Sequence, residues 1–303
     1  MDRIDAMKVF IAALDEGSLA GASRRTGRSP AAVSRAVAFL EAHVGVPLLH
    51  RTTRSIKLSE AGERYAAACR RVLAELEEAD RQAAGERSVP RGTLTITATV
   101  FAGVELLRPI VDAFIDEHPT VNVRMHLLER AVNLIDEGMD LALRITHLAD
   151  SNLIAHRIGE VRRVTVASPR YLATHPRIDE PQDLAKHKIV TTAHMGIDSW
   201  SFPPPSGSTI ARAVAFAPRL VVNNVRAAIA SAVDGYGVTR VLSYHVARQV
   251  QSDELRIVLT DFEPDPIPVS LVSPQGRLAV PKVRAFVDFA VPRLRAAFAR
   301  LTP

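Results

Sequence analysis

Cysteine is nearly absent from this sequence, because Cys69 is the only one among 303 residues. A single thiol excludes an intramolecular disulfide framework, and it also excludes the CxxC motifs of redox and metal sites. The sequence therefore suits a reducing compartment.

Long apolar runs are missing as well. No stretch approaches the roughly 18 to 20 apolar residues that a membrane-spanning helix needs. The first ten residues, MDRIDAMKVF, are amphipathic and carry acids early, without the apolar core of a signal peptide. We therefore expect a cytoplasmic protein that does not enter a membrane.

The motifs of common catalytic and metal sites are also lacking. The ten histidines show neither HExxH nor zinc-finger spacing, and neither a GxSxG elbow nor a phosphate-binding loop occurs. Gly235 and Gly237 form a GxG without the third glycine of a dinucleotide fingerprint, so we interpret them as a helix stop. We expect no enzyme, no metal site and no cofactor.

Basic charge, in contrast, is concentrated in one segment. The net charge is +5 and the sequence pI is about 9.7, which alone favours anionic partners only weakly. Between Arg24 and Lys57, however, seven arginines and lysines stand against the single acid Glu41. An apolar fraction of 47% indicates a globular chain, and its length allows about two domains.

The sharpest local pattern is SPAAVSRAVAFLE, Ser29 to Glu41. Ser29 is a favourable N-cap and Pro30 a favourable first helical residue, so the sequence defines where this helix begins. One face is apolar and we expect it to be buried, and it carries Val33, Val37, Leu40 and Val44. The opposite face is small or basic and carries Ala31, Ser34, Arg35 and Ala38. That face fits a DNA major groove, although an ordinary solvated face would look similar.

A short basic hairpin follows this helix. Residues 48–50 and 56–58 can pair as strands around RTTRS, which places Arg51 and Arg54 on a loop tip. Such groups contact phosphates and position a protein on a duplex without reading its sequence. With two shorter helices before it, at residues 4–14 and 19–26, the segment predicts a winged helix-turn-helix.

From Ser59 the sequence predicts one long helix with a heptad seam. The seam carries Gly62, Tyr65, Cys69, Val72, Leu76, Ala79 and Ala83. A seam of this kind favours a partner helix, most simply from a second copy of the chain. Because Cys69 belongs to the seam, we interpret it as a packing residue and not as a redox switch. Residues 84–92 resemble a linker.

Beyond the linker, strands alternate with helices. The sequence predicts strands at 93–99, 121–128 and 140–145, with helices at 103–119 and 131–138 between them. This rhythm is typical of parallel sheets covered by helices on both faces, and the fold class is therefore α/β.

Over its full length the sequence resembles the LysR-type transcriptional regulators. The resemblance rests on SPAAVSRAVAFLEAHVGVPLLHRTTRSIKLSEAG and on the weaker motifs LIDEGMDLALRI, VASPRYLATHP, DGYGV and PKVRAFVDF. It implies an N-terminal winged helix-turn-helix at 1–58, a dimerising linker helix and hinge at 59–92, and a periplasmic-binding-protein-like effector domain at 93–303. The first lobe of that domain would hold 93–163 and 269–303, and the second 164–268. The implied DNA contacts are Pro30, Ala31, Ser34 and Arg35 in the major groove and Arg51, Thr52 and Arg54 at the wing.

The resemblance also implies partners. These are double-stranded operator DNA, a small-molecule inducer between the lobes, further copies of the chain in a dimer or tetramer, and RNA polymerase as a candidate. The seam of that oligomer would contain Tyr65, Cys69, Val72, Leu76 and Ala79.

For the inducer we expect contacts from loops that face the gap between the lobes. The expected residues of the first lobe are Thr99, Val100, Phe101, Glu129, Arg130, Arg144 and Thr146, and those of the second are His194, Trp200 and Asn224. Arg130 and Arg144 could bind an acidic ligand or simply pair with neighbouring acids. Trp200 could form the floor of an aromatic pocket or pack in the core. Phe101 stands where many relatives carry a Ser or Thr that holds an inducer carboxylate. Either Thr99 could substitute for that residue, or the inducer could be less polar here.

Two other function classes remain open at this point. A solute-binding module would explain residues 93–303 but not the basic winged segment. An α/β enzyme would need a nucleophile or metal motif that the sequence does not offer. The leading hypothesis is a regulator in which an inducer shifts a conformational equilibrium.

Overall fold

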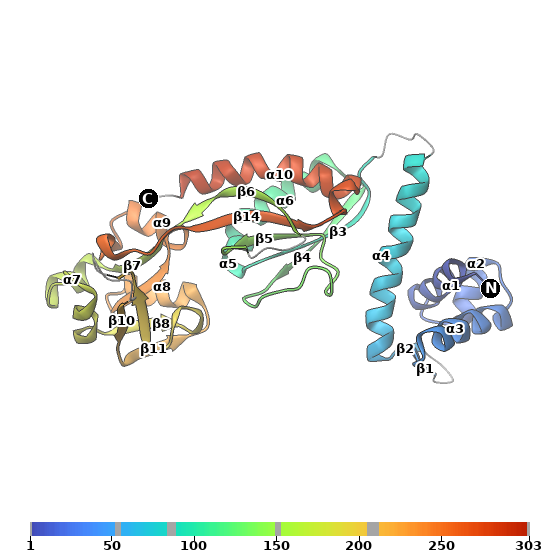
Figure 1. The fold of residues 1–303 in the computed structure, drawn as a ribbon, viewed down its shortest axis with the longest axis horizontal. Helices are drawn as coiled ribbons and strands as arrows, with labels where there is room; N and C mark the ends of the chain where they lie inside the picture. Colours follow the sequence, from blue (N-terminus) through green and yellow to red (C-terminus); the bar gives the residue numbers. More distant parts are fainter. Residues whose placement is uncertain (1, 52–55, 84–88, 149–152, 205–211, 302–303) are drawn as a thin grey trace. The chain divides into compact units, whose positions relative to one another are not determined.

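The computed structural model describes residues 2–51, 56–83, 89–148, 153–204 and 212–301. The chain divides into two compact units, Met1–Val89 with Ile135–Gly138 and Pro90–Leu134 with Met139–Pro303. Figure 1 shows the elements of each unit. Within the described ranges, no helix is both long and apolar enough to cross a membrane.

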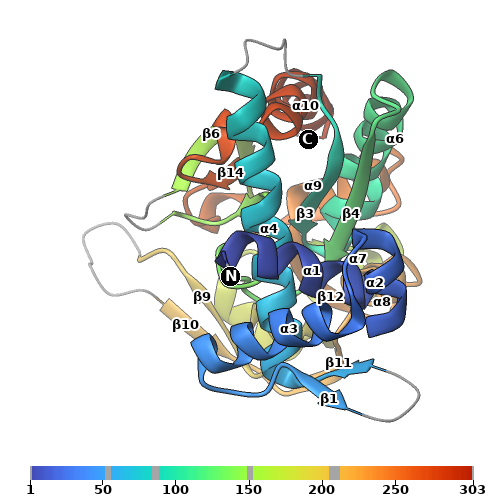
Figure 2. The ribbon, with the colours of Figure 1, turned by 90° about the vertical axis from the view of Figure 1, so that its right-hand side faces the viewer.

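The N-terminal unit contains three short helices, a hairpin and one long helix (Figure 2). Its elements are α1 (Arg3–Asp15), α2 (Leu19–Thr26), α3 (Pro30–Val44), β1 (Leu49–Arg51), β2 (Ile56–Leu58) and α4 (Glu60–Ala83). The strands β1 and β2 pair antiparallel, with Leu49 opposite Leu58.

Side-chain caps begin α2 and α3, as the sequence predicts. The Ser18 hydroxyl accepts a hydrogen bond from the N–H of Gly21, and the Ser29 hydroxyl accepts one from the N–H of Ala32. Gly27 ends α2 and Gly45 ends α3, both with positive φ, which glycine adopts without steric cost. The first turn of α3 is therefore fixed at both the cap and the proline.

The core of the N-terminal unit joins all four helices and the hairpin. Phe10 of α1, Leu40 of α3 and Leu48 before β1 are fully buried, and Cys69 and Leu73 of α4 belong to the same cluster. Gly62 lets α4 approach the chain before β1, because a Cβ there would lie 2.0 Å from the carbonyl oxygen of Leu48. Helix α4 is thus packed against the three short helices and the hairpin of its own unit.

The C-terminal unit contains two five-stranded sheets. The first has the order β4-β3-β5-β14-β6 and the second β11-β8-β12-β7-β13. The strands of the first sheet are β3 (Gly92–Ala98), β4 (Val121–Leu127), β5 (Leu141–Ile145), β6 (Leu153–Val161) and β14 (Ile267–Pro274). Those of the second are β7 (Arg163–Ala167), β8 (Ile189–Thr192), β11 (Pro218–Val222), β12 (Val238–Leu242) and β13 (Arg256–Val258).

Helices cover both sheets. On the first sheet, α6 and α10 pack side by side through Phe114 and Phe286, whose rings meet edge to face at 5.0 Å (Figure 1). On the second sheet, α8 and α9 share a buried cluster with β7 and β12. The other face of that sheet is covered by α7 and by the hairpin of β9 and β10, around Trp200. The bounds are α5 (Val100–Ala102), the π turn η1 (Gly103–Leu107), α6 (Arg108–Glu117), α7 (Pro169–Thr174), α8 (Val225–Val233), α9 (Ser243–Gln251), α10 (Pro281–Arg300), β9 (Ser199–Phe202) and β10 (Arg212–Ala215).

The chain passes between the two sheets twice. It leaves the first sheet at Val161, enters the second at Arg163, and returns between β13 and β14. Arg162, at the first crossing, pairs with Glu263, near the second, at 3.0 Å. Burial raises the pKa of Glu263, and the charge of Arg162 opposes that rise. The ion pair thus joins the two crossings.

Three local expectations differ from the structure. Residues 131–138, expected as a helix, form turns, because Asn133 and Gly138 favour turn conformations over helix. Each sheet is mixed, because one strand, β14 in the first sheet and β7 in the second, runs antiparallel to the other four. Val44, expected in the buried stripe of α3, is 37% exposed, since the last turn extends past the core.

Candidate nucleic-acid interface and effector site

The outer face of α3 has the composition that groove entry requires. Pro30, Ala31 and Arg35 are exposed and Ser34 is half-buried, while Val33 and Val37 on the opposite face are buried. The α-helical spacing therefore separates an anchored face from a small, polar one. The four residues expected in the major groove lie together on this exposed face.

Part of the basic charge near α3 is already paired within the unit. Arg28 pairs with Asp5 at 2.5 Å and Arg25 with Asp15 at 3.2 Å, so α2 is tied to α1. Arg24 and Arg35 are exposed. These two cations are therefore available to an anionic partner.

The side chain of Glu41 connects helix α3 to the hairpin of β1 and β2. The Glu41 carboxylate accepts hydrogen bonds from the N–H groups of Leu48, at 2.9 Å, and Leu49, at 3.1 Å. Of the expected wing residues, Arg51 ends β1 but its side chain is outside the described part of the structure, and Thr52 and Arg54 lie outside the described residues. No sequence pattern indicated this role of Glu41.

The expected seam of α4 is distributed over two environments. Tyr65 and Cys69 contact the core of the unit itself, and burial raises the pKa of the Cys69 thiol. Val72, in contrast, is 42% exposed, and Leu76 is half-buried. The Ala79 side chain is outside the described part. The part of the seam that faces solvent therefore begins near Val72.

The expected inducer residues after β3 and β4 come together. The N–H of Val100 donates to the Glu129 carboxylate at 3.1 Å, and the Thr99 hydroxyl beside it is buried. Burial raises the pKa of Tyr244, and the negative charge of Glu129 adds to that rise. The structure thus brings together Thr99, Val100, Glu129 and Tyr244. Of these, Tyr244 was not indicated by the sequence.

The arginines expected to bind an acid have protein partners. Arg144 donates to the carbonyl oxygen of Val132, and Arg130 donates to that of Ala131 at 3.3 Å. Thr146 is exposed after β5. These contacts favour the structural interpretation of Arg144 over a role in ligand binding.

On the second sheet, Trp200 is a core residue. It is 1% exposed and packs on Phe216 at 4.8 Å, under the guanidinium of Arg240. Burial lowers the pKa of Arg240 to about 10. Asn224 is exposed and caps α8, accepting from the N–H of Arg226 at 2.8 Å. The His194 side chain is outside the described part.

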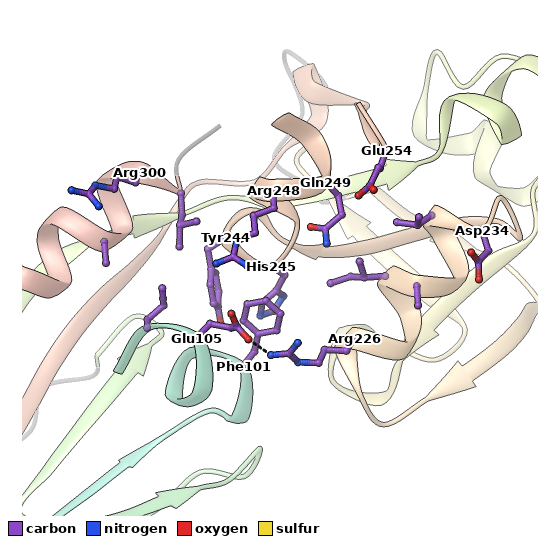
Figure 3. A pocket seen from close by; sticks show the side chains of 16 residues that line it. Phe101, Glu105, Arg226, Asp234, Tyr244, His245, Arg248, Gln249, Glu254 and Arg300 are labelled. Carbon is purple, nitrogen blue, oxygen red and sulfur yellow. Dashed lines mark hydrogen bonds and ion pairs between the residues drawn. The ribbon is translucent and has the colours of Figure 1, made fainter. Parts of the chain in front are cut away.

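A pocket of about 530 Å³ lies within the C-terminal unit (Figure 3). Its walls come from the segment after β3 and from α8, α9 and the end of α10. Of the expected inducer residues whose side chains the structure describes, only Phe101 lines it. The sequence could not indicate the remainder, because α9, which supplies Tyr244, His245 and Arg248, was not predicted and helical spacing alone does not mark a pocket.

The pocket has an aromatic wall crossed by an ion pair. Phe101 meets Tyr244 edge to face at 5.5 Å and His245 at 4.6 Å. Arg226 pairs with Glu105, and its guanidinium lies 5.0 Å from the centre of the Phe101 ring. Among the described residues, no three histidine, cysteine or acidic side chains gather as a metal ion would require.

Comparisons with known proteins agree with this arrangement. The family model described as "Bacterial regulatory helix-turn-helix protein, lysR family" matches residues 4–63, and "LysR substrate binding domain" matches residues 87–295. An HTH-type transcriptional regulator of Xanthomonas campestris pv. campestris is 35% identical over 94% of this chain and 84% of its own length. The HTH-type transcriptional activator AaeR of Escherichia coli is 30% identical over 89% of this chain and 86% of its own. The structure of CrgA, a LysR-type transcriptional regulator from Neisseria meningitidis, is similar with a TM-score of 0.59 and 26% identity, covering 96% of this chain and 98% of that one.

Proposed function

The chain belongs to the LysR family of transcriptional regulators, and from this premise we propose how its parts divide the work. The resemblance predicted from the sequence is thereby confirmed. The protein is a DNA-binding transcriptional regulator with an effector-binding domain, and it forms oligomers. The family is one of regulators and not of enzymes.

The DNA-reading part, in this proposal, is the winged helix-turn-helix of residues 1–58. Pro30, Ala31, Ser34 and Arg35 would enter the major groove, and Arg51, Thr52 and Arg54 would contact phosphates. The observation that carries the proposal is the α3 helix itself, with its cap at Ser29, its buried valines and its small exposed face. Small side chains allow the backbone to approach base edges, and Arg35 can reach them.

The effector, in this proposal, binds between the two lobes of residues 93–303, the first holding 93–163 and 269–303 and the second 164–268. The neighbourhood of Thr99, Val100 and Glu129 supports this assignment because the residues after β3 and β4 lie at the carboxyl ends of two parallel strands. Binding there would shift the relation between the lobes and so alter DNA binding.

The oligomer would be a dimer, or a tetramer built as a dimer of dimers, with α4 and the hinge at residues 59–92 as its link. The exposed Val72 and half-buried Leu76 support a contact along the outer half of α4. We further propose that the protein acts in the cytoplasm and that RNA polymerase is a partner at its promoters.

A footprint of the full chain on the DNA upstream of its own gene and of the neighbouring gene tests this function. We expect two protected half-sites and an affinity that falls steeply as salt increases, because phosphate contacts release counterions. Diffuse protection at every salt concentration, with and without cell extract as a source of effector, would contradict sequence-specific recognition. The identity of the protected genes would then narrow the search for the effector.

A further inference from the structure

The pocket in Figure 3 is separate from most of the residues assigned above to the effector. It shares Phe101 with them, but its other walls are the first turns after β3 and the helices α8, α9 and α10. Its volume of about 530 Å³ falls in the range of sites for small organic molecules. The pocket is therefore large enough for a ligand of its own.

One wall of this pocket is aromatic and rigid. The rings of Tyr244 and His245 lie 4.2 Å apart, and both contact Phe101. The imidazole Nδ1 of His245 accepts from the N–H of Leu242 at 3.3 Å, which fixes the ring. Burial lowers the pKa of His245 to about 3, so the ring is neutral at physiological pH. A neutral, fixed aromatic wall favours a planar ring packed against it.

Cationic groups lie beside that wall. Arg226 reaches from α8 over Phe101 to the Glu105 carboxylate. Arg248 follows Tyr244 by four residues on α9, and therefore projects from the same face of the helix. Figure 3 places the acids Asp234 and Glu254 on the side of the pocket away from Phe101. Among the residues that line the pocket, the guanidinium groups of Arg226 and Arg248 thus lie at the aromatic end with the Glu105 carboxylate. Glu129 adds a second carboxylate behind Tyr244, outside the pocket lining.

We propose that this pocket is a second ligand site, and that it takes a planar aromatic carboxylate. The ring packs on Phe101 and His245, and the carboxylate bonds to Arg248 and to Arg226. Arginine is suited to this because its guanidinium donates to a carboxylate in a fixed geometry. The site rests on the pocket and not on the proposed effector response, so it can be tested without DNA.

The ion pair between Arg226 and Glu105 couples ligand binding in this pocket to the contact between the two sheets. Glu105 follows β3 of the first sheet, whereas Arg226 lies in the first turn of α8 on the second. A ligand carboxylate competes with Glu105 for Arg226, and so replaces a direct contact between the two sheets' helices with one through the ligand. Ligand binding would therefore change the contact between the segment after β3 and helix α8, and with it the contact between the two sheets.

The first experiment compares three molecules that share one ring system. Indole-3-acetate, indole-3-acetamide and tryptamine are titrated into the full chain by calorimetry. We expect the carboxylate to bind at least about tenfold more tightly than the neutral amide, and the amine to bind most weakly, because only the carboxylate pairs with arginine. Equal affinities, a preference for the amine, or no binding by any of the three would overturn the proposal.

Variants then locate the site. Arg248→Gln should weaken indole-3-acetate binding at least about tenfold, and Ala230→Trp, at an exposed pocket position of α8, should abolish it by filling the space. Arg124→Gln, which removes an exposed arginine from β4, is the matched control and should leave affinity unchanged. Unchanged binding in Ala230→Trp, or loss of binding in Glu129→Gln instead, would place the ligand elsewhere and overturn the assignment.

The direction in which a third variant changes ligand affinity shows whether the ion pair competes with the ligand or holds the pocket open. Glu105→Gln removes the competitor for Arg226 while keeping the side-chain shape, so it should tighten indole-3-acetate binding several-fold. Arg226→Gln should weaken it. If Glu105→Gln weakens binding as well, the ion pair holds the pocket open instead of competing with the ligand, and the proposed exchange is wrong.

Discussion

The carboxylate of Glu41, near the end of the recognition helix, accepts a hydrogen bond from the backbone N–H of Leu48 at 2.9 Å. A second hydrogen bond, from the N–H of Leu49 at 3.1 Å, reaches the same carboxylate oxygen. Leu48 is fully buried and Leu49 opens β1. One side chain of α3 thus sets where the hairpin begins relative to the helix.

Replacing this carboxylate should loosen the hairpin. In Glu41→Ala two backbone donors lose their acceptor, and we expect the N-terminal unit to be destabilised by about 1 to 3 kcal/mol. Hydrogen exchange of the Leu48 and Leu49 amides should accelerate in the folded protein, which mass spectrometry can measure on the peptide that contains them. Glu77→Ala, which removes an exposed carboxylate from α4, is the control. Equal exchange in the wild type and Glu41→Ala would show that other contacts hold the hairpin.

Arg35 should distinguish operator from random DNA. It is exposed on the small face of α3, so Arg35→Ala should weaken binding to the footprinted operator by about 1 to 3 kcal/mol if the side chain reads a base. Mobility-shift titrations on operator and on scrambled DNA of equal length provide the measurement, with Arg124→Ala as control. An equal loss on both DNAs would make Arg35 a phosphate contact, as we expect for Arg54→Ala.

The N-terminal elements could be predicted closely because their signals are local. The cap at Ser29 and the proline after it both act within one turn, so α3 begins as expected. The same local rules gave a helix at 131–138 that does not exist, and they missed α9. At 131–138 the turn preference of Asn133 and Gly138 outweighs the apolar periodicity that predicted a helix.

The effector region was harder to predict for a different reason. Sequence order can indicate which residues follow strands, and it correctly brought Val100 next to Glu129. It cannot indicate which polar side chains are already satisfied, so the bond from Arg144 to Val132 and the burial of Trp200 were both left open. Pairings between residues more than a hundred positions apart, such as Glu105 with Arg226, follow only from the packed fold.

Val72 should report on self-association. It is 42% exposed on the outer half of α4, where a second copy of the helix would cover it. Val72→Glu should shift the oligomer toward smaller species, because a charge in the seam would be buried without a partner. Sedimentation over a range of concentrations measures the shift. Ala74→Glu, which places the same charge at a neighbouring exposed position, is the control, and the same loss of assembly in both variants would mean that charge on α4, and not the seam, is responsible.

His245 should make the stability of the C-terminal unit depend on pH. Burial lowers its pKa to about 3, well below the value of roughly 6.5 in an unfolded chain. At a pH between these two pKa values, the imidazole of His245 is protonated in the unfolded state and neutral in the folded state. The free energy of unfolding is therefore unaffected above about pH 7 and falls as the pH drops below 6.5, by at most about 1.4 kcal/mol per pH unit.

The variant His245→Phe should remove this contribution while keeping an aromatic ring in the pocket wall. Trp200 is the only tryptophan and is buried on the second sheet, so its fluorescence during urea unfolding reports on the C-terminal unit. We expect the free energy of unfolding of the wild type to fall by about 1 to 2 kcal/mol more than that of His245→Phe between pH 7 and pH 5. The same substitution at the exposed His147 serves as control for the loss of a surface imidazole. Parallel pH profiles in the wild type and His245→Phe would show that His245 is hydrated in solution, and that the aromatic wall it helps to build is open to water.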